Sequence, residues 1–452
     1  PFVVSVLFLG AVFFTFWYRW INIRGFKHSL EIIMGRYDRE EDKGEISHFK
    51  ALTSALSATV GLGNIAGVAI AIQAGGPGAV LWMIIAAVFG MSAKFSSCTL
   101  SQLYRKENPD GSISGGPMYY LDIGLRQFGK GVGAFGKLLG VIFAVMVMGG
   151  SIGGGNMFQA NQTVEALKTT FRLGSGSEWV IGIVMAFFVA IVVLGGIKRI
   201  GAATSKIVPF MCGLYVLASL FVIFANADKI PETLALIWKM AFTDNAFFGG
   251  MVGVAVMGIR RAAFSNEAGL GSAAIAHAAA KTDEPVREGL VAMIGPFIDT
   301  IIICLMTSLV VVITGAWNMP ELTSQGANIG VSITSEAFRT VLPWFPYVLA
   351  VCVCLFAYST MISWCYYGER GWIYLMDHVG YGKGIKTVVI FRILFVVAVV
   401  VGAVNSLSDV IDFTDAMILS MAFPNIIGSV ILAPKVLKKV DDYWSRYKAG
   451  AF

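Results

Sequence analysis

Three glycines and an amide side chain interrupt a long apolar stretch near the start of the sequence. Gly61, Gly63 and Gly67 stand beside Asn64 in the segment SALSATVGLGNIAGVAIAIQAGGPG. Each glycine weakens a helix by about 1 kcal/mol relative to alanine, so the segment is expected to unwind near its middle. The freed N–H groups of such a break can bind a carboxylate, and its freed carbonyl groups can bind a cation. Close packing of two helices through small residues is the alternative explanation.

A second apolar stretch is interrupted in the same way, in the segment GIRRAAFSNEAGLGSAAIAHAAA. Its polar residues Arg260, Arg261 and Glu267 are followed by Gly269 and Gly271. Two glycine-interrupted segments in corresponding positions of two halves are typical of transporters built from inverted repeats, which bind their substrate where the repeats meet. The pair of segments therefore favours a transport site over two unrelated packing contacts.

Ionisable residues inside apolar stretches are costly and are candidates for function. Asp299 is expected either to help bind a cation or to pair with one of the two arginines named above. Glu267 is expected to brace the interrupted stretch, and Lys94 is expected to extend its ammonium group to the membrane surface. Asp415 lies at the outer end of the last apolar stretch, where it either lines an access vestibule or begins a solvated helix.

A third candidate lies in the stretch FAYSTMISWCYYGERG. Ser359 and Thr360 are adjacent hydroxyl residues, and Thr360 shares one helix face with Trp364 because the two are four positions apart. A hydroxyl and an aromatic ring on one face suit a small polar ligand with little side chain. The alternative is that each hydroxyl bonds to a carbonyl of its own helix.

The sequence contains no constellation typical of an enzyme. HExxH and paired-carboxylate motifs are absent, and the six cysteines lie in or beside apolar runs as small buried hydrophobes. The glycine-rich segment GGSIGGGNMFQANQT lacks the lysine of a phosphate loop, and close helix packing explains it better. The four histidines are scattered along the chain, at His28, His48, His277 and His378.

The elements that position these residues are helices that cross a membrane. Hydrophobic residues make up 56% of the 452 residues and charged residues only 14%, whereas a soluble globular protein has about 25% charged residues. The apolar runs are long enough for a span, which needs roughly 20 residues. Eleven spans are expected, at residues 2–20, 48–74, 77–103, 134–163, 178–197, 203–225, 246–279, 287–315, 345–367, 386–404 and 408–433.

Lysine and arginine residues predict the orientation of these spans in the cell membrane. They are abundant after the first span, in alternate later loops and in the C-terminal tail. The positive-inside rule therefore places the C-terminus in the cytoplasm and the N-terminus outside. The stretch between the first two spans is expected to form an amphipathic helix on the membrane surface, or else a solvated linker. The net charge of +6 reflects this topology and indicates a lipid bilayer, not a nucleic acid, as partner.

Three long segments strongly resemble the alanine or glycine:cation symporter family of the amino acid–polyamine–organocation superfamily. They are SATVGLGNIAGVAIAIQAGGPGAVLWM, GSISGGPMYYL and RRAAFSNEAGLGSAAIAHAAAKTDEPVREGLVAM. The resemblance implies an all-α membrane protein with a leucine-transporter-like fold, in which two five-helix repeats are inverted and the second and seventh helices are broken. The implied parts are a peripheral helix and amphipathic linker at 1–47, repeats at 48–225 and 246–433, and a cytoplasmic tail at 434–452.

The resemblance also implies a site for a small neutral amino acid. Backbone N–H groups at the first break would hold the carboxylate, carbonyl groups at the second break would hold the ammonium group, and Trp364 would favour glycine and alanine over larger side chains. Gln73 would lie on the outer pathway or at the top of the pocket. The implied substrate-binding residues are Thr59, Gly61, Leu62, Gly63, Asn64, Gln73, Phe264, Ser265, Thr360 and Trp364.

A sodium ion would lie between the first break and the span at 345–367. Oxygen-only ligation suits such a hard cation. A second sodium ion near Asn64 and Asp299 is a further implication. The implied ligands of the first ion are the carbonyls of Ser57, Val60 and Phe356 and the hydroxyls of Ser359 and Thr360.

The resulting hypothesis is a sodium-coupled symporter that imports alanine or glycine by alternating access. Sodium binding would stabilise the conformation that binds the amino acid, so that each ligand favours the other. Asp299, Glu267 and Asp415 are the candidates for coupling or gating. The alternatives are a proton-coupled carrier that titrates Asp299 or Glu267, and a membrane receptor or channel, although the sequence has no continuous polar stripe typical of a channel.

Overall fold

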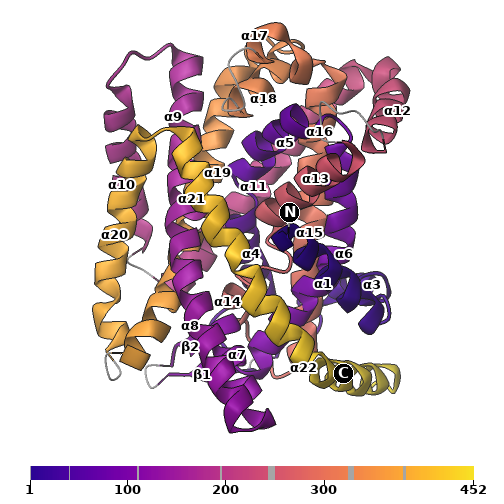
Figure 1. Cartoon of the computed structure of the whole chain (residues 1–452), viewed down its shortest axis with the longest axis vertical. Coiled ribbons are helices and arrows are strands. Elements are labelled where there is room, and N and C mark those ends of the chain that lie inside the picture. Colours follow the sequence, from indigo (N-terminus) through magenta and orange to yellow (C-terminus); the bar gives the residue numbers. More distant parts are fainter. Residues whose placement is uncertain are drawn as a thin grey trace.

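The computed structural model describes residues 2–39, 41–108, 111–193, 196–242, 250–323, 330–379 and 383–452. Within these ranges the chain is a bundle of helices (Figure 1). Its strands there are one short antiparallel pair, Lys106–Glu107 (β1) and Ile113–Ser114 (β2).

Seven helical segments of the described chain are long and apolar enough to cross a membrane. They are expected from long runs of apolar residues, because a helix satisfies all its backbone hydrogen bonds internally and can therefore lie in lipid. The elements that form them are α6 (Ala79–Leu103), α8, η3 and α9 (Lys130–Ile152, Gly153–Met157 and Phe158–Phe171), α11 (Gly196–Ala225), α15, η6 and α16 (Pro285–Pro296, Phe297–Cys304 and Leu305–Ile313), α19 (Phe345–Val379), α20 (Gly384–Val404), and α21 and α22 (Leu407–Ser420 and Ala422–Lys448).

The second expected span is broken, as predicted. Helix α4 (His48–Thr59) begins after Ser47, whose side chain caps it. The chain continues through η1 (Gly63–Gly67), a π-helical turn, into α5 (Val68–Gly75), and the two halves are bent by 53°. With this bent pair the structure has up to eight segments that qualify as spans by length and composition.

The second glycine-interrupted stretch is also broken. Helix α13 (Gly250–Asn266) ends where Glu267, Gly269 and Gly271 have φ angles of 57°, 82° and 89°. Glycine adopts such left-handed conformations at no steric cost, so the glycines allow the chain to turn before α14 (Ala273–His277). Residues 246–249 of this expected span lie outside the described residues.

Two shorter apolar helices lie at two further expected spans, 2–20 and 178–197. They are α1 (Phe2–Trp17) and α10 (Ser177–Val193). A helix or a helix pair therefore lies at each of the eleven expected positions, although not all of them meet the length and composition of a span.

Several helices had no counterpart among the expected elements. One of them, α18 (Gly330–Arg339), lies directly over the break in the second span, where Thr334 Oγ1 donates to Ile65 O at 3.0 Å. This helix therefore covers one side of the break. The others are α7 (Pro117–Leu125), α12 (Ile230–Ala241) and α17 (Pro320–Thr323).

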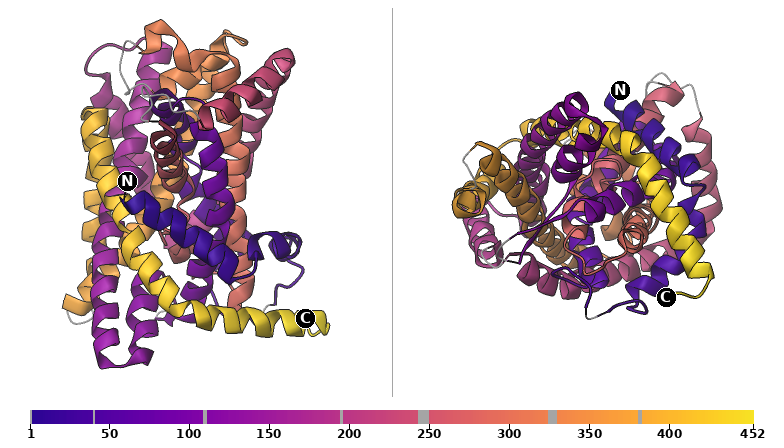
Figure 2. Two further views of the ribbon diagram at one scale, coloured as in Figure 1. Left: turned by 45° about the vertical axis from the view of Figure 1, so that its right-hand side comes forward. Right: turned by 90° about the horizontal axis from the view of Figure 1, so that it is seen from below.

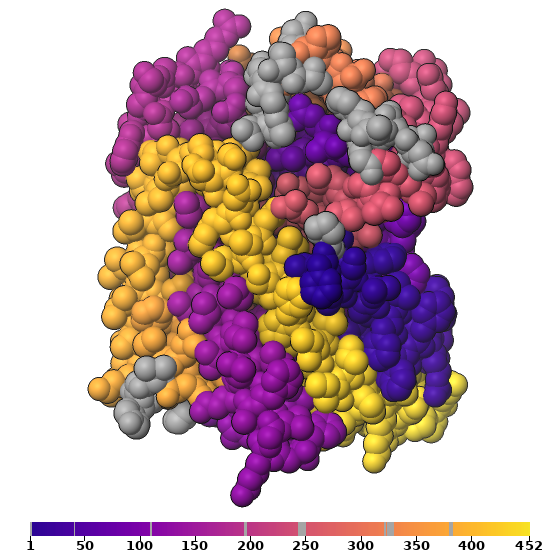
Figure 3. Space-filling view, in the orientation of Figure 1, coloured from indigo at the N-terminus to yellow at the C-terminus, as the bar shows by residue number. Residues whose placement is uncertain are grey.

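The stretch between the first two spans is helical, as α2 (Ile21–Arg24) and α3 (Phe26–Ile33). The expected C-terminal tail is helical as well, because α22 continues to Lys448 and its last part lies across one end of the molecule (Figure 2). On one face of the molecule α22 lies beside α1 (Figure 3). The core forms where α6 packs along α15 and α13, and where α19 packs along α8 and α4.

Candidate functional site

The end of α4 is tied to the middle of α19 by a reciprocal pair of hydrogen bonds. Ser57 Oγ donates to Ser359 O at 2.6 Å, and Thr360 Oγ1 donates to Ser57 O at 3.0 Å. Ser359 Oγ also donates to Phe356 O at 3.0 Å, within its own helix. These residues and Val60 are all buried. The five oxygen-bearing residues expected around sodium therefore lie at one junction between two helices.

Two glycines let α19 approach the neighbouring segments closely. A Cβ atom on Gly61 would lie 2.5 Å from Thr360 Oγ1, and one on Gly155 of η3 would lie 2.3 Å from the Trp364 side chain. Trp364 Nε1 donates to Ala58 O at 3.0 Å, which fixes the indole ring against the end of α4. The ring is buried and lies beside the break.

The N–H groups freed by the break in the second span bind side-chain amide oxygens. Gly61 N donates to Asn64 Oδ1 at 2.9 Å, and Leu62 N donates to Gln159 Oε1 at 3.1 Å. These are among the N–H groups expected to hold a carboxylate, and both donate to a side-chain oxygen here. Gln159, on α9, was not among the expected site residues. It lies in the glycine-rich segment that the sequence explained by helix packing alone.

Asp299, on the π-helical turn η6, joins the two broken stretches. Its Oδ1 accepts from Asn64 Nδ2 at 2.7 Å, and its Oδ2 accepts from Ser265 Oγ at 2.9 Å and Thr300 Oγ1 at 2.8 Å. Asn266 Nδ2 in turn donates to Thr300 Oγ1 at 2.9 Å. A fully buried carboxylate surrounded by neutral donors is chemically suited to a cation.

The two arginines expected as alternative partners of Asp299 contact other groups, since the Arg261 guanidinium lies over the Phe264 ring. Arg260 of α13 forms a short ion pair with Asp415 of α21. Asp415 is buried and Arg260 is half-buried, so the pair is sheltered from water. Asp415 therefore fastens α21 to α13.

Phe264 lies against the break of the second span. A Cβ atom on Gly63 would lie 3.3 Å from the ring of Phe264, and Phe158 packs edge-on against this ring at 5.5 Å between centroids. The guanidinium of Arg261 lies 5.8 Å from the ring centroid, within the range of a cation–π contact. Phe264 and the break are therefore neighbours, as expected.

Glu267 and Lys94 hold the broken end of α13. Ser272 Oγ donates to Glu267 Oε2 at 2.5 Å across the turn, in agreement with the bracing role expected from the sequence. The expectation for Lys94 is wrong, because its side chain is buried and Nζ donates to Asn266 O at 3.0 Å. A cation at a helix C-terminus stabilises the free carbonyl groups there, which explains why this lysine points inward.

Two further expected residues lie on the two helices that flank the break. Thr59 is buried at the end of α4 and its Oγ1 donates to Leu56 O at 3.3 Å, within its own helix. Gln73 lies on α5, beyond the break, and is half-buried.

Comparisons with known proteins add the family to this geometry. The family described as "Sodium:alanine symporter family" matches residues 1–452. The sodium/alanine symporter AgcS of Methanococcus maripaludis is 40% identical over 444 residues, which are 98% of this chain and 94% of that protein. The probable sodium/glutamine symporter GlnT of Bacillus subtilis is 33% identical over 452 residues, 99% of this chain and 88% of that protein.

A solved structure supports the fold. The crystal structure of MhsT in complex with L-phenylalanine has a TM-score of 0.56 with this chain and 13% sequence identity, and the match covers 87% of this chain and 98% of MhsT. At this identity the likeness shows a shared fold and carries no information on the substrate.

Proposed function

Since the chain belongs to the sodium:alanine symporter family, we propose that the amino acid it imports with sodium is alanine or glycine. Membership makes it a multi-pass membrane protein and a sodium-coupled amino acid symporter, not an enzyme. Members similar to it are named for alanine and for glutamine, so the substrate has to be argued from the site.

The observation that carries the proposal is the position of Trp364. Its indole ring is held by Ala58 O and lies against Gly155, directly beside the break of the second span. A ring fixed in this way leaves little room for a substrate side chain. The carboxylate of the amino acid would replace the amide oxygens of Asn64 and Gln159 at the N–H groups of the break. Its ammonium group would meet carbonyl groups near Phe264 and Ser265.

Sodium would bind where α4 meets α19. The carbonyls of Ser57, Val60 and Phe356 and the hydroxyls of Ser359 and Thr360 would coordinate the ion. Each hydroxyl oxygen would do so through its lone pairs, while its proton can still be donated to a carbonyl. Because the ion would hold α4 and α19 together beside the break, sodium and amino acid binding would favour each other. Asp299 with Asn64 is the proposed place for a second ion, since its carboxylate joins both breaks.

Alternating access would move the two halves of the molecule against each other. We take residues 48–225 and 246–433 as the two inverted repeats, with the N-terminus outside and the C-terminus in the cytoplasm. The Arg260–Asp415 pair joins α13 to α21 and would have to open to admit substrate, so it is the proposed outer gate. Glu267 would keep the broken end of α13 in shape during this motion.

Uptake of labelled alanine into proteoliposomes with an inward sodium gradient tests the proposal. Thr360→Val removes a proposed sodium ligand and is expected to lower the apparent sodium affinity by about tenfold or more. Thr314→Val is the matched control, because the Thr314 hydroxyl bonds to Val310 O of its own helix, away from the site. Wild-type uptake should require sodium and should not be supported by potassium.

Three outcomes would contradict parts of this proposal. Faster uptake of glutamine than of alanine would show that the substrate is wrong while the coupling stands. Equal sodium affinity in Thr360→Val and Thr314→Val would remove Thr360 from the ion site. Uptake that ignores sodium and follows a pH gradient would move the coupling to Asp299 or Glu267.

A further inference from the structure

Two of the four histidines contact the same buried carboxylate, although the sequence scatters them. His277 Nδ1 lies 2.5 Å from Glu288 Oε1, and His48 Nδ1 makes a still shorter contact with Glu288 Oε2. The three side chains are 0% or 1% exposed. Both oxygens of Glu288 thus accept from imidazole, and the three residues form what we call the histidine–glutamate cluster.

The cluster joins segments that have to separate if this end of the molecule opens. His48 is the first residue of α4, His277 is the last residue of α14, and Glu288 is on α15. The backbone next to it is paired as well, because Glu45 N donates to Ala279 O at 2.8 Å and Lys281 N donates to Ile46 O at 2.7 Å.

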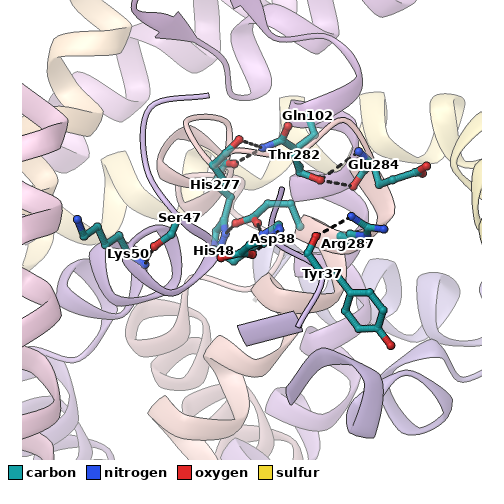
Figure 4. Close-up of polar contacts among 12 residues, drawn as sticks. Tyr37, Asp38, Ser47, His48, Lys50, Gln102, His277, Thr282, Glu284 and Arg287 are labelled. Atoms are coloured by element: carbon teal, nitrogen blue, oxygen red, sulfur yellow. Dashed lines mark hydrogen bonds and ion pairs between the residues drawn. The ribbon is translucent and has the colours of Figure 1, made fainter. Parts of the chain in front are cut away.

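Helix α6 supports the same contact from the other side. Gln102 Nε2 donates to His277 O at 2.6 Å (Figure 4), and the Arg105 guanidinium donates to Ala280 O at 2.7 Å. Arg446, near the end of α22, pairs with Glu284 directly before α15, so the cluster lies toward the end of the bundle that we propose to be cytoplasmic. The N-terminal half of the broken second span is therefore fastened here to the segment that follows the second break.

Charged groups face the cluster from each neighbouring element. The His48 Nε2 atom lies 4.0 Å from Asp38 Oδ1, and both Asp38 and Asp283 are exposed to water and are screened by it. The Cys98 thiol of α6 also faces Glu288. The charged groups that interact with the cluster or its partners are Asp38, Arg39 and Asp42 in the loop before α4, Asp283 before α15, Arg105 just after α6, Glu107 on β1 and Arg287 on α15.

Glu288 carries a buried charge that one protonated histidine balances. Its ion pairs within the described residues are those with His48 and His277, so with both imidazoles neutral the carboxylate has no positively charged partner there. A net charge in a buried site is costly. One imidazolium beside Glu288 removes it and strengthens both short hydrogen bonds.

We propose that the histidine–glutamate cluster is a proton-binding site that holds one proton while this end of the pathway is closed and releases it when α4 moves away. Opening separates His48 from Glu288 and admits water. A hydrated histidine has a pKa of about 6.5, so the proton leaves at neutral pH. By linkage, low pH favours the closed arrangement, and this contribution is lost as the pH rises.

The proton and sodium are expected to favour each other, a step that rests on the proposed sodium site. His48 and Ser57 lie on the same helix, α4, so the position of α4 that pairs His48 with Glu288 also brings Ser57 to Ser359 and Thr360. Sodium affinity should therefore rise as the pH falls. Competition between protons and sodium for the Asp299 carboxylate would produce the opposite slope.

The test is the binding of labelled sodium to purified protein from about pH 8 to about pH 6. We expect the sodium dissociation constant of the wild-type protein to fall by up to about tenfold over this range. In His48→Asn combined with His277→Asn the amide nitrogens can still donate to Glu288 but cannot take up a proton, so the pH dependence should flatten. His378→Asn is the matched control, because His378 pairs with Asp122 at 3.3 Å away from the cluster, and it should keep the wild-type slope.

A sodium affinity that weakens as the pH falls, or a double variant that keeps the wild-type slope, would overturn the proposal. A second measurement does not depend on the sodium site. In sodium-free buffer, the melting temperature of the wild-type protein minus that of the double variant should shrink as the pH rises from about 6 to about 8. A melting-temperature difference that does not change with pH would overturn the proton site. If the protein bound no sodium but the melting-temperature difference still depended on pH, only the sodium site would be overturned.

Discussion

Gly155 brings two parts of the site together by having no side chain. A Cβ atom there would lie 2.3 Å from Cβ and from Cγ of Trp364, much closer than real Cβ atoms approach other atoms. The tryptophan is held on its other side by Ala58 O. The position of the indole ring, and with it the proposed limit on substrate size, therefore depends on Gly155.

Gly155→Ala is expected to push the Trp364 ring out of place and to lower alanine uptake by about tenfold or more, since overpacking a tight site costs about 1–3 kcal/mol. The matched control is Gly213→Ala on α11, where a Cβ atom would have no neighbour within 4 Å. That variant should transport like the wild type, and its helix should gain up to about 1 kcal/mol. Uptake per folded protein in proteoliposomes compares the two, and equal uptake would contradict the role of Gly155.

The sequence predicted part of this site and missed the rest for a physical reason. Adjacent hydroxyls singled out Ser359 and Thr360, the family resemblance implied Ser57, and these residues contact one another. Gln159 and Glu288 carried no such pattern. Their importance comes from partners on helices distant in the sequence, and only the packing of the bundle brings those partners together.

At the scale of elements, the two broken stretches could be recognised in the sequence more easily than the π-helical turn η6. Glycines marked both broken stretches because they are poor helix formers with free backbone angles. The π-helical turn η6 contains no glycine. It follows Pro296, which lacks an N–H group and cannot complete the regular hydrogen-bond ladder. That proline was the available signal for the wide turn that carries Asp299.

Helices α3 and α22 are joined outside the membrane spans by an aromatic cluster with a titratable centre. His28 Nε2 lies 2.7 Å from Tyr443 Oη, and the His28 ring lies 4.2 Å from the Tyr447 ring between centroids. Arg446 of α22 also pairs with Glu284. Burial lowers the pKa of His28 below its usual value of 6.5, and this outweighs the opposing contact with Glu31.

Protonation of His28 is therefore expected to loosen α22. Because the pKa of His28 is depressed in the folded state, its contribution to docking is fully present above about pH 6.5 and is lost as the pH falls below that value. Hydrogen exchange of residues 434–448 should become faster between about pH 7 and about pH 5 after correction for intrinsic rates. His28→Gln should remove this extra pH dependence, and exchange that stays pH-dependent in the variant would assign the effect to another group.

At the scale of the whole molecule, the apolar runs predicted the positions of the helices, and a helix or helix pair lies at every expected span. The reason is that a long apolar helix is stable in a bilayer whichever helices pack against it. The same runs carry no information on which helices touch. The approach of His48 to His277, and the position of α18 over the break, follow from the arrangement of the whole bundle. The comparison with MhsT supports that arrangement at the level of the fold.

The orientation of the bundle is the remaining prediction at this scale, and it follows from charge. The C-terminal tail is rich in lysine and arginine, which the positive-inside rule places in the cytoplasm. The turn between α9 and α10 lies at the opposite end of the molecule from the C-terminus (Figure 1). It contains Gly174, where an added side chain would meet open space.

Gly174→Cys should react with a membrane-impermeant maleimide in intact cells, whereas Lys448→Cys, at the exposed end of α22, should react only after permeabilisation. The native cysteines are buried or half-buried, so the protein without either substitution is the background control. The reverse labelling pattern would invert the molecule in the membrane. It would also place the histidine–glutamate cluster on the outer side, so that external and not cytoplasmic pH would act on it.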